Sequence, residues 1–539
     1  MRLFISMNIF LKKHNISRED VVLCVIAIVS VCVAVFSIMT VGRVSINSDT
    51  ATPVLLLKSQ NEAKSMFPDS WCYANGAVWF LSLETMLRPF MLVGSAVLAR
   101  NLCSVMVVVL FSIGLILLDR DVFRNRSYLM VIFLVLIGMW GSSEHILYQG
   151  AYLWVITRMI FQIWLFCKIC NSENGCILWY ILLGILVCIR AVGGVRELGD
   201  NVVPMLGAAL ITLLFDLNRE KLIFWIKRII PIVTGAVIGF GVNQYIAQTH
   251  IVNNTDRNSM MMISSLNEIG DVVFIYIKNL FFSFGYNGGT SLISLAGLRN
   301  LCSVVMCVFF VIVIPSLQIR KLKEESEVFQ LFFTYATLHC LIVIIMIMFC
   351  GEFEPRYVIT VIFLSCVISC YYIKKYWIDK GFLGKNLFMF AFIIVSTIGI
   401  VGMIGDSNGW RDQYNAEMSF VSELRSHNLS KGYGDYWATY MLDVYSEGDI
   451  RTGAVSVSEE GITPHRWLVD EKVFVPDDIN TFLMLEVEQN ELIEENIEDF
   501  FGKPLEIFET KWCGYKPVVI YVFDHDIMGD KGIIEKKDI

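Results

Sequence analysis

Charged residues are scarce in this chain of 539 residues. Asp, Glu, Lys and Arg make up 17 % of it, whereas ordinary soluble domains contain about a quarter. Hydrophobic residues make up 55 %, and the mean hydropathy is +0.60. The apolar residues come in long runs, not in the periods of 3.6 or 2 residues that half-buried helices and strands show. This composition excludes a soluble enzyme and indicates a membrane protein.

Several motifs of familiar chemistry are also missing from the sequence. It contains no G-x-x-x-x-G-K-[ST], no H-E-x-x-H and no G-x-S-x-G, so nucleotide hydrolysis and common hydrolase mechanisms have no support. Cys167 and Cys170 lie at the end of an apolar run without His partners, which argues against a zinc site. No basic segment with interleaved aromatic residues is present, so nucleic acid is not an expected partner.

Eleven apolar runs follow one another in the first three quarters of the chain, and each could cross about 30 Å of hydrocarbon as a helix. They lie at about 21–41, 91–118, 127–141, 151–170, 176–193, 202–217, 229–247, 300–317, 329–350, 357–373 and 387–405. The third, fifth and sixth are short or interrupted. We predict a multi-spanning α-helical membrane protein with about eleven transmembrane helices.

Lys and Arg gather in alternate loops, near 12–18, 120–126, 219–228, 320–323 and 374–385. Because basic residues are retained on the cytoplasmic side during insertion, this pattern predicts a cytoplasmic N-terminus, 1–20, and a C-terminus on the outer face. No small-residue cleavage site follows the first run. We therefore predict that 21–41 is retained as a signal anchor.

The apolar runs end near Asp406, where a highly charged segment begins. Residues 406–539 hold 28 acidic and 12 basic side chains. Their spacing predicts a helix over 412–427 and strands over 482–488, 505–512 and 517–524. We predict a small extracytoplasmic α/β domain over 406–539, whose simplest role is to stabilise the transmembrane domain, 21–405.

Two cysteines, Cys72 and Cys513, both fall on the outer side in this topology. An oxidising compartment there would permit a disulfide between them. Two free thiols are the other interpretation, and the sequence leaves both open.

The first outer segment, 42–90, is far too long for a turn, and its semi-apolar pieces at about 51–66 and 77–88 suit helices. Asp49 stands at its start, just beyond the first span. A carboxylate there could act as a general base that takes a proton from an acceptor hydroxyl. A helix N-cap is the alternative, because Ser48, Asp49 and Thr50 precede a helical run.

The second outer loop, GSSEHILYQG at 141–150, places Glu144 and His145 directly before a span. A His beside an acid at a membrane interface suits the handling of a proton or a substrate. A solvated loop end is the alternative interpretation.

Arginines lie at the outer ends of two later spans. Arg190 ends the fifth span, Arg196 follows in GGVRELGDN, and Arg356 with Tyr357 in GEFEPRY precedes the tenth. An arginine at such a depth needs a carboxylate or a phosphate as partner, so each either binds an anion or pairs within the protein. Lys58 is a further candidate for a phosphate contact.

A long outer loop over 248–299 contains Arg257 and the Met-rich piece SMMMISS. Such a segment could cover a cavity, or its Met and aromatic residues could serve for packing and lipid contact.

Taken together, these features resemble the GT-C superfamily of multi-spanning glycosyltransferases, which includes protein O-mannosyltransferases and aminoarabinose transferases. The resemblance rests on the single N-terminal span, Asp49 in INSDTA, the Arg-Tyr of EFEPRY and the outer C-terminal domain. The segment GYGDYWATYMLDVYS, 432–446, also resembles one that recurs in bacterial members of this group. The chain has neither a WWD-type motif in its tail nor an Asp-Glu doublet in its first loop.

The resemblance implies an inverting hexosyl- or pentosyltransferase in the bacterial plasma (inner) membrane. Its donor would be a polyprenyl-phosphate sugar, and its acceptor a cell-envelope glycan, lipid or protein. Asp49 would be the catalytic base, and Arg356 would hold the donor phosphate with help from Arg190 or Lys58. No cofactor follows from the motifs, and nothing in the sequence supports a divalent metal.

Two other functions stay open for the sequence. A transporter or flippase of lipid-linked saccharides should carry charges at the membrane midplane and broken helices in corresponding halves. A polymerase of such saccharides would also have many spans and outer-loop arginines. The charged residues cluster instead at outer span ends, which favours an enzyme at the interface.

Overall fold

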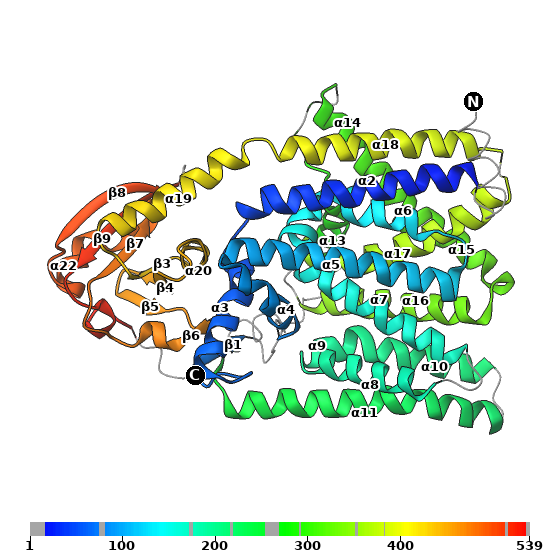
Figure 1. The fold of residues 1–539 in the computed structure, drawn as a ribbon, viewed down its shortest axis with the longest axis horizontal. Helices are drawn as coiled ribbons and strands as arrows, with labels where there is room; N and C mark the ends of the chain where they lie inside the picture. The colour runs from blue at the N-terminus through cyan, green and yellow to red at the C-terminus, as the bar shows by residue number, and fades with distance from the viewer. Residues whose placement is uncertain are drawn as a thin grey trace. The chain divides into compact units, whose positions relative to one another are not determined.

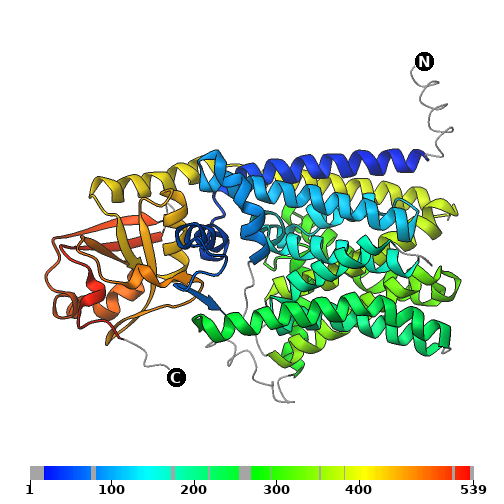
Figure 2. The ribbon, with the colours of Figure 1, turned by 60° about the horizontal axis from the view of Figure 1, so that its bottom comes forward.

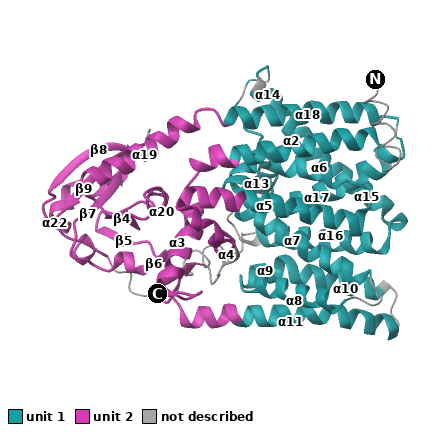
Figure 3. Cartoon of the chain, viewed as in Figure 1, with its two compact units in different colours: residues 1–37, 105–241, 258–406 teal, residues 38–104, 242–257, 407–539 magenta. Residues whose placement is uncertain are grey.

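A computed structural model gives the fold of the chain. It describes residues 17–74, 81–171, 176–215, 219–253, 269–289, 291, 293–350, 354–381, 383–512 and 516–534. The chain forms two compact units (Figure 3). Unit 1 consists of Met1–Ser37, Val105–Gly241 and Asn258–Asp406, and unit 2 of Ile38–Ser104, Val242–Arg257 and Ser407–Ile539.

All eleven predicted apolar runs are helical. The helices are α2 (Arg18–Thr40), α5 (Ala96–Leu118), α6 with η4 (Tyr128–Phe133, Leu134–Gly138), α7 (Ala151–Cys170), α8 (Ile177–Ala191), α10 (Val203–Phe215), α11 (Arg219–Thr249), α14 with η8 and α15 (Leu295–Cys307, Val308–Val313, Ile314–Lys321), α16 (Glu327–Cys350), α17 (Ile359–Tyr372) and α18 (Lys385–Asp406). Within unit 1 the helices run side by side (Figures 1 and 2). The prediction of a multi-spanning helical membrane protein is confirmed.

Helix length separates these runs into two groups. In the described part of the chain, nine helices are long and apolar enough to cross a membrane. Tyr128–Gly138 and Ile177–Ala191, in the third and fifth predicted runs, are shorter apolar helices. The count of eleven spans stays a prediction. The segment 248–299, predicted as a loop, contains a further helix, α13 (Ile269–Ser283).

Small residues let α8 and α11 approach closely in unit 1. A Cβ added at Gly235 would lie 2.4 Å from the carbonyl oxygen of Gly184, and one added at Gly239 would lie 2.2 Å from that of Cys188. Gly235 and Gly239 form a G-x-x-x-G pair, which brings membrane helices into backbone contact because no side chain separates them.

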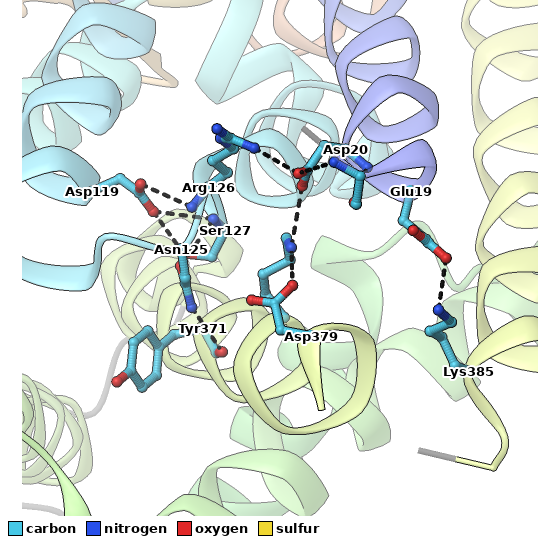
Figure 4. Close-up of polar contacts among 11 residues, drawn as sticks. Glu19, Asp20, Asp119, Asn125, Arg126, Ser127, Tyr371, Asp379 and Lys385 are labelled. Atoms are coloured by element: carbon cyan, nitrogen blue, oxygen red, sulfur yellow. Dashed lines mark hydrogen bonds and ion pairs between the residues drawn. The ribbon is translucent and has the colours of Figure 1, made fainter. Parts of the chain in front are cut away.

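Polar side chains gather at one end of the unit 1 helices (Figure 4). Asp20 at the start of α2 pairs with Arg126 at 2.7 Å and with Lys374 at 3.1 Å, and the neighbouring Glu19 pairs with Lys385 at 2.7 Å. These bases come from loops predicted to be cytoplasmic, so the structure brings together segments that the charge pattern assigns to one side. The assignment of this end to the cytoplasm stays a prediction.

Unit 2 contains a six-stranded sheet in the order β5-β4-β3-β7-β9-β8. The strands are β3 (Lys431–Gly434), β4 (Arg451–Ser458), β5 (Gly461–Pro464), β7 (Thr481–Glu486), β8 (Glu506–Trp512) and β9 (Lys516–Phe523). β3 pairs in parallel with β4 and β7, whereas the other neighbours are antiparallel. The three predicted strands and the predicted helix, α19 (Trp410–Ser426), are confirmed.

The core of this sheet follows from the alternation of side chains along β7. Leu483 and Leu485 pack in one apolar cluster with Ile493 of α21 (Val487–Ile493) and Phe501 of α22 (Ile497–Phe501). Phe482, which alternates with them, points to the opposite face and is also buried. The sheet is therefore covered on both faces at its central strand β7.

Segments of the first outer loop belong to the same unit as the tail. They form α3 (Ser48–Ala63), α4 (Leu81–Leu87) and β1 (Trp71–Ala74). β1 lies between β2 (Val252–Asn253) and β6 (Val469–Asp470) in a small sheet. α3 packs against α4, β6 and α20 (Tyr436–Tyr445).

Candidate functional site

Asp49 lies in the first turn of α3 and is not its N-cap. The cap is Asn47, whose side chain accepts a hydrogen bond from the backbone N–H of Thr50 at 3.0 Å, while the Thr50 hydroxyl accepts from the backbone N–H of Asn47. This reciprocal capping box provides hydrogen-bond acceptors for two backbone N–H groups at the start of the helix. The alternative interpretation of Asp49 as a cap is therefore wrong.

The Asp49 carboxylate meets a tyrosine of the tail. The hydroxyl of Tyr436, at the start of α20, donates a hydrogen bond to Oδ1 of Asp49 at 2.9 Å. The side chain of Ser48 also donates to the carbonyl oxygen of Tyr436. The segment 432–446, singled out by its sequence, thus supplies the helix that lies against the predicted base.

Lys58 lies further along α3 and is paired within the protein. Its Nζ donates to Oδ1 of Asp443 on α20 at 2.6 Å. Burial raises the pKa of Asp443, and the positive charge of Lys58 acts in the opposite direction. This ion pair accounts for Lys58 without a phosphate.

A second set of candidates gathers in unit 1 around a buried carboxylate. Glu197 of α9 (Val195–Glu197) accepts from Nε of Arg190 at 2.8 Å, and Nη2 of Arg158 lies 3.6 Å from its other carboxylate oxygen, Oε1. Arg190 also donates to the side-chain oxygen of Gln162 at 3.2 Å. All three charged side chains are more than nine-tenths buried.

More exposed arginines stand beside this buried group. The guanidinium carbons of Arg196 and Arg356 lie 5.1 and 5.7 Å from the ring centroid of Tyr357. Arg196 lies 3.9 Å from Asp200, and Arg356 pairs with Glu354 at 2.5 Å. Their side chains are 43 % and 22 % exposed, so they meet solvent or a ligand more readily than Arg190 does. We call Arg158, Arg190, Arg196 and Arg356 the arginine group.

The loop residues Glu144 and His145 also belong to unit 1. They begin η6 (Glu144–Tyr148), with Glu144 exposed and His145 half-buried. The centroid of the His145 ring lies 5.9 Å from that of Tyr152, in an edge contact. His145 therefore packs against the start of α7.

His339 was missed by the sequence analysis, although it supports this region. It is buried in α16, where Nδ1 lies 2.5 Å from the carbonyl oxygen of Asp200 and Nε2 lies 3.0 Å from the hydroxyl of Thr360. A contact with a carbonyl oxygen requires a proton on Nδ1. A histidine within an apolar run is the signal that could have identified it.

The described residues give little support to metal or thiol chemistry. Within the described ranges, no three His, Cys, Asp or Glu side chains gather in a way that could hold a metal ion. Cys72 is buried in β1, and its thiol donates to the carbonyl oxygen of Arg466 at 3.3 Å. Cys513 and Arg257 lie outside the described residues.

The predicted residues thus fall into two sets, each within its own unit. Asp49 and Lys58 face α20 in unit 2, whereas Arg190, Arg196, Arg356 and Tyr357 gather in unit 1. The first set offers a carboxylate on a capped and packed helix, and the second offers guanidinium groups beside an aromatic ring. A carboxylate can accept a proton, and guanidinium groups can bind a phosphate.

Comparisons with known proteins identify the fold. No family model and no curated protein match the sequence. The structure of ArnT from Cupriavidus metallidurans bound to undecaprenyl phosphate matches with a TM-score of 0.56 at 9 % identity, over 92 % of this chain and 97 % of that one. The apo structure of the same protein matches with a TM-score of 0.50 at 10 % identity, over 88 % and 93 %. The predicted GT-C-like fold is confirmed by this similarity to ArnT.

Proposed function

We propose that the protein is an inverting glycosyltransferase, which moves a sugar from a polyprenyl-phosphate donor to a hydroxyl of a cell-envelope acceptor. The observation that supports it most is the arginine group of unit 1, in a chain whose fold matches, over nearly its whole length, a protein that binds undecaprenyl phosphate. The arginines have a chemical purpose in such an enzyme, because the donor phosphate is the leaving group.

The two arginines of the group that are most exposed are the ones we assign to the donor phosphate. Arg158 and Arg190 are engaged with Glu197, whereas Arg196 and Arg356 lie on the more exposed side with Tyr357. A planar guanidinium can donate two parallel hydrogen bonds to phosphate oxygens. Such donors also stabilise the negative charge that grows on the phosphate as the glycosidic bond breaks.

Asp49 is the residue we assign as general base. In the transfer, the acceptor oxygen bonds to the anomeric carbon while the bond from that carbon to the phosphate oxygen breaks. The proton of the acceptor hydroxyl passes to the Asp49 carboxylate, and the bonding electrons leave with the polyprenyl phosphate. Attack from the face opposite the leaving group inverts the anomeric configuration.

The test is sugar transfer by the full-length protein in vesicles, with undecaprenyl-phosphate-linked sugars as donors and envelope lipids and glycans as acceptors. Asp49→Asn keeps the shape of the side chain but cannot accept the proton, so kcat should fall about 10²- to 10⁴-fold. Glu62→Gln is the matched control, because Glu62 lies on the same helix and its side chain is 49 % exposed. This variant should transfer sugar like the wild type.

Each other outcome favours a different assignment. Full transfer by Asp49→Asn would exclude Asp49 as the base and direct attention to Glu144 and His145. Movement of the labelled donor across the vesicle membrane without a new glycosidic bond would favour a flippase. Products with many added repeat units would favour a polymerase.

A further inference from the structure

We infer that Tyr436 of the C-terminal tail is a positioning residue for Asp49. The inference deepens the proposed function and rests on it. The phenol hydroxyl is the donor in the 2.9 Å hydrogen bond to Oδ1 of Asp49. A carboxylate has about four lone-pair sites on its two oxygens, so the hydrogen bond from the Tyr436 phenol does not by itself prevent Asp49 from accepting a proton from a substrate.

Contacts at two levels fix α20 along α3. Near the start of both helices, the Ser48 hydroxyl donates to the carbonyl oxygen of Tyr436, in addition to the bond between the Tyr436 hydroxyl and Asp49. Further along, Lys58 pairs with Asp443 at 2.6 Å. Because the helices are tied at both levels, neither can slide or rotate without breaking a polar contact.

The Tyr436 ring is itself held by three aromatic neighbours. Its centroid lies 5.0 Å from that of Trp437, 5.3 Å from that of Tyr440 and 5.3 Å from that of His465. The interplanar angles of 62–78° are those of edge-to-face contacts, which aromatic pairs prefer. Such packing limits the directions in which the hydroxyl can point.

The sheet of the tail in turn anchors α20. The Asp435 side chain caps the helix by accepting from the backbone N–H of Trp437 at 2.8 Å. The hydroxyl of Thr452 on β4 donates to the carbonyl oxygen of Thr439 on α20 at 2.7 Å. The tail therefore has a specific task in this proposal, which is to hold a hydrogen-bond donor against the base.

Tyr436→Phe tests the inference, because it keeps the ring contacts and removes only the hydroxyl. The matched control is Tyr440→Phe, which removes a buried hydroxyl from the same helix but leaves the bond to Asp49 intact. In the vesicle assay, Tyr436→Phe should lower kcat about tenfold or more with KM for the donor unchanged, since a hydrogen bond to a charged group is lost. Tyr440→Phe should keep kcat within about twofold of the wild type.

The outcomes separate this inference from the proposed function. If Asp49→Asn is inactive while Tyr436→Phe and Tyr440→Phe have equal kcat, Tyr436 does not position the base, although the proposed function stands. If both tyrosine variants lose activity in proportion to lost thermal stability, the role of Tyr436 is structural and the inference is wrong. Transfer by Asp49→Asn at the wild-type rate, or no transfer by the wild type, would overturn both proposals.

Discussion

Nζ of Lys58 lies 2.6 Å from Oδ1 of Asp443, and this ion pair joins the first outer segment to the C-terminal tail within unit 2. The partners are 385 positions apart in the sequence. Lys58 follows Asp49 on α3, and Asp443 follows Tyr436 on α20. The contacts Asp49–Tyr436 and Lys58–Asp443 therefore occur in the same order along both helices. The pair therefore belongs to the framework that supports the predicted base.

Lys58→Met should destabilise unit 2. The substitution leaves the Asp443 carboxylate without its cation, and breaking a fully buried pair costs about 3–5 kcal/mol. The side chains are 26 % and 15 % exposed, so we expect a smaller loss, about 1–3 kcal/mol. Thermal unfolding of the detergent-solubilised protein measures the loss. An unchanged Tm would show that solvent replaces the pair.

The stability difference between Lys58→Met and the wild type should depend on pH. Burial raises the pKa of Asp443, and Lys58 opposes this shift, so removing Lys58 raises the pKa further. A carboxyl with a raised folded pKa favours the folded state when it is protonated, and this contribution is lost as the pH rises through that pKa. The Tm difference should therefore be largest at neutral pH and shrink towards acidic pH. A difference that stays constant would contradict the role of Asp443.

Glu447 should stabilise the start of α5 from the tail. Its carboxylate accepts from the backbone N–H of Ala96 at 2.7 Å and from the hydroxyl of Ser95 at 3.0 Å. A side chain that satisfies a free N–H at a helix start contributes about 0.5–2 kcal/mol, so Glu447→Ala should lower the Tm accordingly. Glu459→Ala, at an exposed position in the turn after β4, is the control and should change stability by less than about 0.5 kcal/mol.

Glu197→Gln should be among the more damaging single substitutions in unit 1. The substitution removes the negative charge of residue 197, while the positively charged Arg190 and Arg158 stay buried beside it. An uncompensated buried charge costs about 3–5 kcal/mol, so the variant should give little folded protein in detergent. Glu220→Gln on the exposed start of α11 is the control. Normal folding of Glu197→Gln would mean that the arginines find other partners.

The sequence predicted the helices well because most of the apolar runs are long enough to span a membrane as one helix. In the tail, β7, β8 and β9 were predicted from their β-branched and aromatic residues. β3 was missed, since Lys431–Gly434 has two glycines in four residues. A Cβ at Gly432 would lie 2.3 Å from the ring of Phe482, and one at Gly434 would lie 2.8 Å from the carbonyl oxygen of Met484. The need for glycine at these two positions can be seen only when β3 is paired with β7.

The residues of the candidate site could be predicted from the sequence, whereas most of their contacts could not. Arg190, Arg196, Arg356 and Tyr357 stand out in the sequence because polar residues at span ends need partners. The identity of those partners depends on contacts over long separations, such as the 387 positions between Asp49 and Tyr436. The cap at Asn47 was missed because Ser, Asp and Asn are equally good caps, and only the backbone shows which of them begins the helix.

Arg356→Gln should weaken binding of undecaprenyl phosphate about 10- to 100-fold, since a charge-assisted hydrogen bond to the phosphate is lost. The pair with Glu354 is partly exposed, so the cost in stability should be below about 1 kcal/mol. Arg299→Gln is the matched control, because Arg299 also pairs with a carboxylate, Asp406 at 2.9 Å, and lies 4.8 Å from an aromatic ring, Trp140.

Binding is measured with undecaprenyl phosphate itself in detergent at two salt concentrations, so that turnover is not needed. The wild type and Arg299→Gln should bind alike, and Arg356→Gln and Arg196→Gln should bind weakly. Higher salt should weaken wild-type binding more than binding by the two weak variants, since they have lost a charge that salt would screen. If all four proteins bind equally well, Arg196 and Arg356 do not hold the donor phosphate.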